Sequence, residues 1–544
     1  MNSSYTHARI AIVWILPILL LSTTWVIFGC YYETNDDVAI TQVVRGETAL
    51  GPVSNLHLYF HGLSYGLAAL YRLLPAIPWY GLLLYALLYI SLVLLYGMLF
   101  HLLAPTLSLL GITACFIVVY WLTWQETALL MNYTRLPILL VATGTLFAAS
   151  RRGQFLPLLI GLAIVALGWS IRPSAAVLGL LVAIPGAWWL AGFRATIPLA
   201  SAGLLIAVAT VAVATTYSPV EKTYRQIDML LVSYTDYSLY QLRPTTAADS
   251  LGQIAVDNWA LGDSTIVNER FFKRNAYFDS PSFLRQTLVR KAFTFYYLLR
   301  NHYLGLILFP IVVGLWLSLR DTWRRHWEFW VAQVLFAAFL LLLATALKLP
   351  LRIASPLFSV WTVSTVIYIA RHSIWMLHLT TVWRLAFCGA LFFYSFAIWH
   401  ESRMYHRLQE QNEAYMSQVY KLAKQHTLVV GGVEWAYIYL SPFTTYELSD
   451  SPVVTLMGWL TLEPSLVELR QHLTGTRDFR ESLNRLAATP NTIWMMRDSF
   501  ASYLQLYMQR HNSNPATTLR FVSQQSLSSN SEFAKVYEAR VSTR

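Results

Sequence analysis

Charged residues are scarce in this chain: only 12% of its 544 residues are Asp, Glu, Lys or Arg, whereas 56% are hydrophobic. A soluble globular domain carries about 25% charged residues. This deficit excludes an ordinary soluble protein and predicts an α-helical polytopic membrane protein. The formal net charge of +11 then fits a membrane interface or a phosphate-bearing lipid, and we expect no nucleic-acid partner.

Cysteine is equally sparse. The three cysteines, Cys30, Cys115 and Cys388, lie within or at the ends of apolar segments, and no CxxC motif is present. This excludes a disulfide framework, so exported regions must hold together without disulfides. Because no small-residue cleavage site follows the first apolar segment, that segment is expected to be a retained helix rather than a signal peptide.

Long apolar runs, by contrast, are abundant, and a membrane-spanning helix needs about 20 such residues. We expect a transmembrane domain over residues 1–400 with about eleven spans. They lie near residues 10–30, 80–103, 107–123, 136–150, 155–170, 174–191, 197–216, 301–319, 328–347, 353–370 and 380–399.

The distribution of arginine predicts the orientation of these spans. Short loops carry Arg9, Arg151, Arg194, Arg320 and Arg371, and basic residues favour the cytoplasmic side. The N-terminus is therefore expected in the cytoplasm. Two outer loops, residues 31–79 and 217–300, and the C-terminal segment then lie on the exported face.

Residues 401–544 are expected to form a small exported soluble α/β domain. A polar helix spans about 401–424, and strand-like runs follow near 428–432, 492–496, 519–523 and 535–540, with helical patterns at 464–473 and 498–510. Alternation of strands and helices of this kind is typical of an α/β domain.

Few ionisable residues fall at the midpoints of the expected spans. They gather instead near the outer ends, at Asp36, Asp37, Glu126, Arg135, Arg172, Lys348 and Arg352. A transporter or flippase usually places such groups at mid-membrane, so the pattern favours a site at the outer surface. Carboxylates at that depth lose hydration and are costly unless they are paired or functional.

Transfer of a sugar from a lipid phosphate requires a general base and cations. Asp36 or Asp37 can accept the proton of an acceptor hydroxyl, and Arg172, Lys348 and Arg352 can stabilise the departing phosphate. Simpler roles stay open: Asp36 or the asparagine before it could cap a helix, and the cations could anchor headgroups.

Two further pairs carry weaker signals. His57 and His61 are four residues apart and could face one side of a helix. A divalent metal, an interfacial histidine pair without metal, and a contact of His61 with the donor phosphate are the alternatives. Glu126 and Arg135 could form an ion pair that rigidifies an outer loop.

The second outer loop contains the sequence Trp259-Ala260-Leu261-Gly262-Asp263. Trp259 and Asp263 could line an acceptor groove, although a packed loop tryptophan is the more common outcome. The sequence is not the WWDYG-type signature of oligosaccharyltransferases, which argues against protein N-glycosylation.

Taken together, these features resemble the GT-C superfamily of integral membrane glycosyltransferases, which use polyprenyl-phosphate sugars. The likeness lies in the layout of about residues 1–400. One helix precedes an outer loop with an acidic pair, Asn35-Asp36-Asp37, where many members have Asp-Glu. A stretch rich in His, Tyr and Pro follows over 57–78, and then come an Ile171-Arg172-Pro173 turn and a Lys348–Arg352 turn.

The resemblance implies a role for each of these positions. The first-loop acid of the family is the catalytic base, which carries over to Asp36, with Asp37 in the second acidic place. Because the pair is Asp-Asp, which carboxylate acts stays open. Late outer basic residues of the family tend to contact the lipid phosphate.

We therefore expect an inverting glycosyltransferase in a bacterial cytoplasmic membrane. It would move a sugar from a polyprenyl-phosphate carrier to a cell-envelope glycan or glycolipid on the exported face, and the C-terminal domain would help to bind that acceptor. No cofactor is required by the sequence, and a divalent metal stays open. The alternatives are a lipid-linked polysaccharide polymerase or ligase and, with less support, a lipid or sugar transporter or flippase.

Overall fold

The computed structural model describes residues 3–151, 153–320, 323–372, 381–424, 426–446, 451–511, 517–526 and 535–543. It is 75% helical, which confirms a mainly α-helical fold. The chain divides into two compact units. Unit 1 comprises Met1–Glu33, Tyr80–Thr216 and Val289–Arg407, and unit 2 comprises Thr34–Trp79, Tyr217–Leu288 and Leu408–Arg544.

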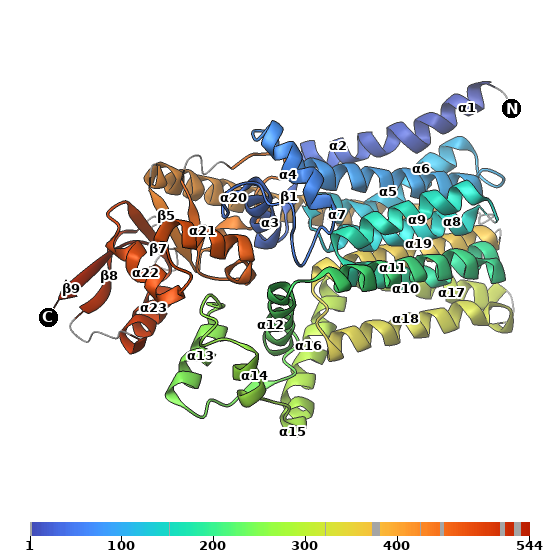
Figure 1. Ribbon diagram of the computed structural model, residues 1–544. Coiled ribbons are helices and arrows are strands. Elements are labelled where there is room, and N and C mark those ends of the chain that lie inside the picture. Colours follow the sequence, from blue (N-terminus) through green and yellow to red (C-terminus); the bar gives the residue numbers. More distant parts are fainter. Residues whose placement is uncertain are drawn as a thin grey trace. The chain divides into compact units, whose positions relative to one another are not determined.

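Unit 1 is a bundle of apolar helices that lie side by side (Figure 1). Its elements are α1 (Ser3–Ile10), η1 (Ala11–Ile15), α2 (Leu16–Phe28), β1 (Tyr31–Tyr32), α5 (Trp79–Leu103), α6 (Leu109–Val119), η2 (Tyr120–Trp124), α7 (Gln125–Leu129), β2 (Leu130–Met131), α8 (Arg135–Ser150), α9 (Phe155–Ile171), α10 (Pro173–Ala191), η3 (Gly192–Ala195), α11 (Thr196–Thr216), α16 (Leu288–Leu298), η5 (Leu299–Tyr303), α17 (Leu304–Arg320), η6 (Trp323–His326), α18 (Trp327–Ala346), α19 (Leu351–Arg371) and the first part of α20 (Thr381–Ala423).

Seven helical segments among the described residues are long and apolar enough to cross a membrane: Tyr5–Phe28, Trp79–Leu103, Leu109–Leu129, Pro173–Thr216, Ser280–Leu319, Arg324–Ala346 and Leu351–Arg371. Two shorter apolar helices, α8 and α9, accompany them. Ten of the eleven expected spans coincide with these seven segments or with α8 and α9. The arrangement is compatible with a polytopic membrane protein. The eleventh, near 380–399, falls in α20, and most of its side chains lie outside the described residues.

The 44-residue segment Pro173–Thr216 is more than twice the length that one crossing needs. It is divided by the 3₁₀ turn η3, which opens on Gly192 at φ +58°. This left-handed backbone conformation is readily adopted by glycine, which lacks a Cβ. Helices α10 and α11 pack against each other, so the segment consists of two helices, which lie where the sequence predicted two spans.

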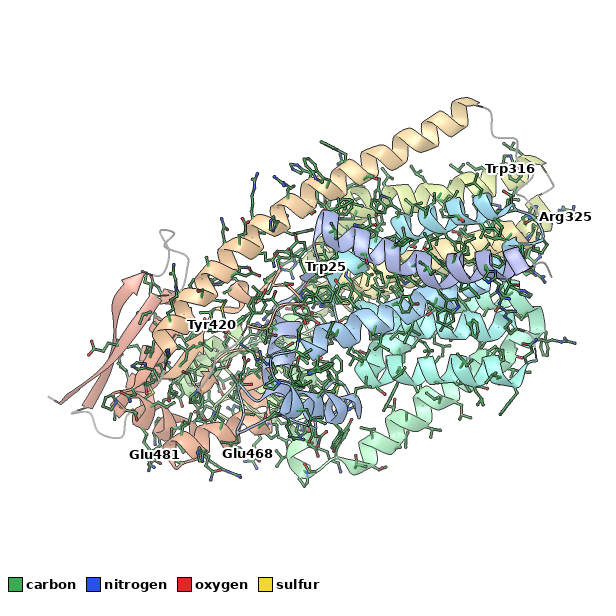
Figure 2. The ribbon with its side chains drawn as sticks, turned by 90° about the horizontal axis from the view of Figure 1, so that it is seen from above. Trp25, Trp316, Arg325, Tyr420, Glu468 and Glu481 are labelled. Atoms are coloured by element: carbon green, nitrogen blue, oxygen red, sulfur yellow. The ribbon has the colours of Figure 1, made fainter. Side chains whose placement is uncertain are left out.

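Many large apolar side chains of unit 1 are exposed, and Trp25 is labelled in Figure 2. Trp25 is 54% exposed and Leu319 is 88% exposed. A soluble monomer rarely exposes contiguous apolar patches of this kind, whereas a bilayer solvates them. By contrast, α8 is buried along almost its whole length. A Cβ on Gly144 of α8 would lie 2.7 Å from the carbonyl oxygen of Gly161 in α9, so these two helices touch through their backbones, as small residues permit in membranes.

Unit 2 contains the shorter and more polar elements. They are α3 (Asn35–Arg45), α4 (Leu63–Leu73), α12 (Pro219–Thr235), β3 (Gln241–Leu242), α13 (Ala247–Asp257), α14 (Glu269–Asn275), β4 (Ala276–Tyr277), α15 (Ser280–Ser282), η4 (Phe283–Thr287), the end of α20, β5 (Thr427–Gly431), η8 (Glu434–Tyr437), β6 (Val453–Thr455), η9 (Trp459–Leu462), α21 (Pro464–Thr474), α22 (Phe479–Ala488), β7 (Thr492–Met496), α23 (Asp498–His511), β8 (Thr517–Ser526) and β9 (Lys535–Thr543).

The C-terminal segment forms a mixed five-stranded sheet in the order β6-β5-β7-β9-β8. Strand β5 pairs in parallel with β6 and β7, while β9 pairs antiparallel with β7 and β8. The four strands expected from the sequence are β5, β7, β8 and β9, and the helices expected at 464–473 and 498–510 are α21 and α23. The three-residue strand β6 was not predicted, because three residues are too few to show an alternating pattern.

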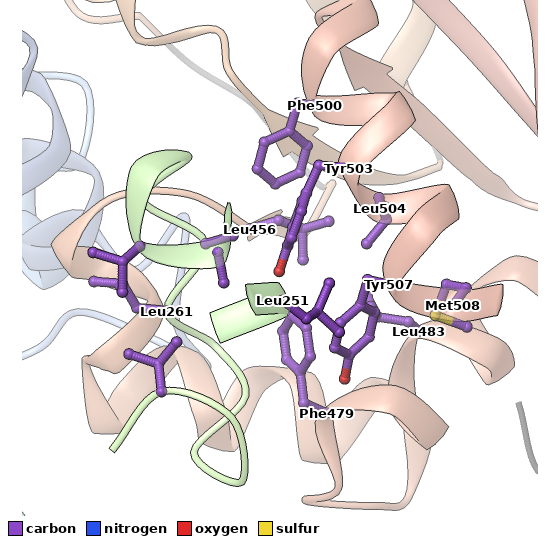
Figure 3. Close-up of a cluster of buried hydrophobic side chains, with 14 of the residues drawn as sticks. Leu251, Leu261, Leu456, Phe479, Leu483, Phe500, Tyr503, Leu504, Tyr507 and Met508 are labelled. Carbon is purple, nitrogen blue, oxygen red and sulfur yellow. The ribbon is translucent and has the colours of Figure 1, made fainter. Parts of the chain in front are cut away.

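The core of unit 2 is built from two segments that are far apart in the sequence. Leu251 and Leu261 of the second expected outer loop pack with Phe479 and Tyr507 of the C-terminal segment (Figure 3). Because this burial removes apolar surface of both segments from water, the loop and the C-terminal segment fold as one body.

Candidate functional site

The acidic pair lies in the first turn of α3. Thr34 is the N-cap residue, with extended backbone at φ −133°, and Asp36 and Asp37 follow within the first turn. The expectation that Asn35 or Asp36 would be the N-cap is therefore wrong by one or two residues. The aspartates still gain from this position, because the partial positive charge of a helix N-terminus stabilises carboxylates.

The two aspartates have different surroundings. Asp37 is fully buried, and its carboxylate accepts a hydrogen bond from the Thr34 hydroxyl at 3.3 Å. Asp36 is only partly buried and accepts a hydrogen bond from the indole nitrogen of Trp459 at 3.1 Å. Asp36 is therefore the more accessible of the two carboxylates.

Trp459 is held from two sides within unit 2. The ring of Tyr59 meets its indole edge to face, with the ring centroids 5.7 Å apart. The backbone N–H of Gly458 donates to the carbonyl of Trp259 at 2.9 Å. Trp259 itself has φ +55° and packs against the unit 2 core. Both expected outer loops and the C-terminal segment thus meet around Asp36.

His57 lies between two carboxylates. Its Nδ1 is 2.9 Å from Glu463, whose side chain is 1% exposed, and its Nε2 is 3.3 Å from Glu221. Burial alone would lower the pKa of His57, but the hydrogen bond and charge of Glu463, with a contribution from Glu221, outweigh it and raise the pKa. His57 therefore ties the first outer loop to both other parts of unit 2.

The expectation that His57 and His61 share a helix face is wrong. Both residues precede α4, in an irregular loop where Phe60 and Gly62 have positive φ. Burial, followed by the charges of Arg225 and His57, lowers the pKa of His61 to about 4. His61 is thus neutral at pH 7. Within the described ranges, no group of three or more His, Cys, Asp or Glu is arranged to hold a metal ion.

The contacts of Asp263 indicate a structural role rather than an exposed binding surface. It is 9% exposed and accepts hydrogen bonds from the Tyr507 hydroxyl at 2.6 Å and from the backbone and hydroxyl of Thr265 at 2.8 and 2.7 Å. These contacts fix the turn after Trp259 against α23. Packing of Trp259 and Asp263 inside unit 2 is the alternative that this geometry favours.

In unit 1, Arg135 joins two carboxylates. It is fully buried at the start of α8 and pairs with Glu33 at 2.6 Å and with Glu126 at 2.9 Å. Glu126 also accepts a hydrogen bond from Ser355 of α19 at 2.8 Å. The expected Glu126–Arg135 ion pair is confirmed. Because the backbone N–H of Glu33 bonds to the Met131 carbonyl beside the β1–β2 pair, this network fixes the chain directly before the acidic pair.

The expected basic residues Arg172, Lys348 and Arg352 lie at two turns of unit 1. Arg172 is the single extended residue between α9 and α10, donates to the Thr134 hydroxyl, and lies 4.9 Å from the ring centroid of Tyr133. Lys348 and Arg352 lie at the α18–α19 turn. Lys291 of α16 donates to the carbonyls of Thr345 and Leu347 at the same turn.

The structure therefore gathers the expected residues in two groups. Glu126, Arg135 and Arg172 lie close together in unit 1, whereas Asp36, His57, His61 and Trp259 belong to unit 2. Convergence of Arg172, Lys348 and Arg352 on the aspartates stays a prediction.

Sequence reasoning missed several partners of these residues: Glu33, Ser355, Lys291, Glu221, Glu463 and Trp459. Glu33 could have been found, because it lies only three residues before Asp36 in the same expected outer loop. The others are joined to their partners only by the fold. Comparison of the chain with models of known protein families and with curated protein sequences found no match.

Proposed function

We propose that this protein is an inverting, membrane-embedded glycosyltransferase of the GT-C type. It moves one sugar from a polyprenyl-phosphate carrier to a cell-envelope glycan or glycolipid on the exported face of a bacterial cytoplasmic membrane. The observation that carries the proposal is the placement of Asp36: a partly exposed carboxylate in the first helical turn after a membrane-spanning helix, oriented by an indole N–H.

The proposed reaction needs one base and one leaving group. The acceptor hydroxyl oxygen attacks the anomeric carbon and forms the new glycosidic bond while its proton passes to the Asp36 carboxylate. The bond between the anomeric carbon and the phosphate oxygen breaks, and polyprenyl phosphate leaves with the electron pair. Arg172, Lys348 and Arg352 are proposed to stabilise that phosphate, with His61 as a hydrogen-bond donor to it.

The composition of unit 2 supports the proposed orientation in the membrane. The second loop expected on the exported face and the C-terminal segment share one hydrophobic core. The first loop belongs to the same unit and contacts the C-terminal segment through Asp36 and His57, so all three are proposed to lie on the same side. The basic loops expected on the cytoplasmic side belong to unit 1. This agrees with a cytoplasmic N-terminus and an exported unit 2.

The decisive test is Asp36→Asn in the full-length protein. Transfer from radiolabelled undecaprenyl-phosphate sugars to a bacterial envelope glycolipid fraction should fall about 10²–10⁴-fold, the usual cost of losing a general base. Thermal stability and donor binding, measured by tryptophan fluorescence, should stay near wild type because the amide preserves size and polarity. Asp257→Asn is the matched control, since Asp257 is exposed and bonded only to Tyr234 among the contacts described.

Two outcomes would contradict the proposal. If both Asp36→Asn and Asp37→Asn transfer sugar at the wild-type rate, the two aspartates have only a structural role in α3. Multiple sugar additions per acceptor in a single encounter would favour the polysaccharide polymerase instead. If Asp37→Asn alone abolishes transfer, the mechanism holds and the base is the second aspartate.

A further inference from the structure

A cavity of about 530 Å³ lies within unit 1, at the ends of α5, α8, α10 and α19. These are the helix ends that the arginine distribution assigns to the cytoplasmic side. The cavity is far along each helix from the turns that carry Arg172 and Lys348, so it is separate from the site proposed for sugar transfer.

The cavity has an apolar floor and a cationic rim. Met98, Leu190 and Ala370 form the floor and are each less than 9% exposed. Arg151, which is half-buried, and Arg371, which is exposed, supply the positive charge of the rim, and the exposed imidazole of His101 lies beside them. In the described part of the chain, no acidic side chain lines the cavity.

The positive charge at the rim is concentrated. Burial is the main cause that lowers the pKa of Arg151, and the charge of nearby Arg9 adds to it. An anion bound at the rim would relieve this repulsion. Guanidinium groups suit phosphate in particular, because their planar donors can bind two oxygens at once.

Capping of helix C-termini is the simpler explanation for such cations. It accounts for Arg371, whose Nε donates to the Trp189 carbonyl in the last turn of α10 at 3.1 Å. It does not account for the apolar floor beneath the rim, which a soluble anion would leave uncovered. A phosphate that carries hydrocarbon chains can contact the cationic rim with its phosphate and cover the apolar floor with its chains.

We propose that this cavity binds an anionic phospholipid, with the phosphate at Arg151 and Arg371 and the acyl chains over the floor formed by Met98 and Leu190. The proposal is independent of the sugar-transfer reaction. Bound lipid would add contacts to the ends of four helices, of which α8, α10 and α19 already pack against one another, so it would further stabilise this end of the bundle.

The test uses purified full-length protein in neutral detergent and native mass spectrometry with added phosphatidylglycerol. Arg151→Gln should weaken phosphatidylglycerol binding about fivefold, the effect of one cation near an anionic headgroup, and Arg151→Lys should retain most of it. Arg194→Gln is the matched control, because Arg194 is an exposed cation of η3 outside the cavity and should bind like wild type. Phosphatidylcholine should bind weakly to all four proteins.

Two results would overturn the proposal. Equal phosphatidylglycerol binding by wild type and Arg151→Gln, with Arg151→Glu also unchanged, would leave the cations as helix caps and surface anchors. If inorganic phosphate displaces the lipid at a concentration similar to that of the lipid, the rim binds a soluble anion and not a phospholipid. Circular dichroism of each variant verifies that a loss of binding is not a loss of fold.

Discussion

Asp36 and Asp37 are neighbours in the sequence, but the fold gives their carboxylates different burial and different hydrogen-bond partners. Asp37 is fully buried and bonded to its own helix cap, Thr34, whereas Asp36 is partly exposed and bonded to the indole of Trp459. A hydrogen bond to a charged group contributes about 1.5–3 kcal/mol and fixes the direction of the carboxylate. Trp459 is therefore a positioning residue for the proposed base, contributed by the C-terminal segment.

Trp459→Phe tests this role at the scale of one hydrogen bond. The change keeps an aromatic ring for Tyr59 and removes only the N–H donor. We expect kcat for sugar transfer to fall about tenfold while the KM for the lipid donor stays within about twofold, because no proposed phosphate ligand changes.

Trp79→Phe is the control for that experiment. Its indole N–H donates to the backbone carbonyl of Leu74 at 3.0 Å in an exposed position, so the variant loses the same donor without affecting a carboxylate. An unchanged kcat in Trp459→Phe, in a protein whose Asp36→Asn variant is inactive, would show that Asp36 needs no orientation by the indole.

At the scale of elements, the short turn η9 connects the C-terminal segment to the first expected outer loop. Trp459 at its start contacts α3, and Glu463 directly after it binds His57 of the first loop. Removing one partner of a buried ion pair typically costs about 3–5 kcal/mol. His57→Gln should therefore lower the thermal stability of the full-length protein clearly at pH 7.

The same pair predicts a pH dependence. Because the folded state raises the pKa of His57, the stability from its charge is fully present below the unfolded value of about 6.5 and is lost as pH rises through the folded value. The difference in melting temperature between wild type and His57→Gln should thus narrow from pH 7 to pH 9. His472→Gln, at an exposed site on α21, is the control, and a gap that widens with pH would contradict the assigned pair.

The sequence was a good guide to elements and a poor guide to the contacts between them. Apolar length located the spans and β-rich runs located β5 and β7, because both signals are local. The bond between Trp459 and Asp36 joins residues 423 positions apart, and nothing near either residue marks it. The spacing of His57 and His61 allowed a shared helix face, and spacing alone does not reveal the positive φ of Phe60 that makes this segment a loop.

At the scale of the whole molecule, the proposed topology makes a direct prediction. Single cysteines introduced at Lys273 and Glu468, in a background where the three native cysteines are alanine, should react with an impermeant maleimide in intact cells with a permeabilised outer membrane. Both positions are exposed in unit 2, and Glu468 is labelled in Figure 2. A cysteine at exposed Gln154 of unit 1 should react only after cell lysis. The reverse labelling pattern would show that the protein has the opposite orientation in the membrane.

Unit 2 is assembled from three stretches of chain, residues 34–79, 217–288 and 408–544, and this has a consequence for biosynthesis. Ribosomes add about 5–20 residues per second, so roughly 20–85 s separate the synthesis of Asp37 from that of Trp459. Throughout that interval the residues of α3 lack their partner Trp459 from the C-terminal segment. The proposed enzyme would thus become competent only when translation is nearly finished, and a prematurely terminated chain would be inserted but inert.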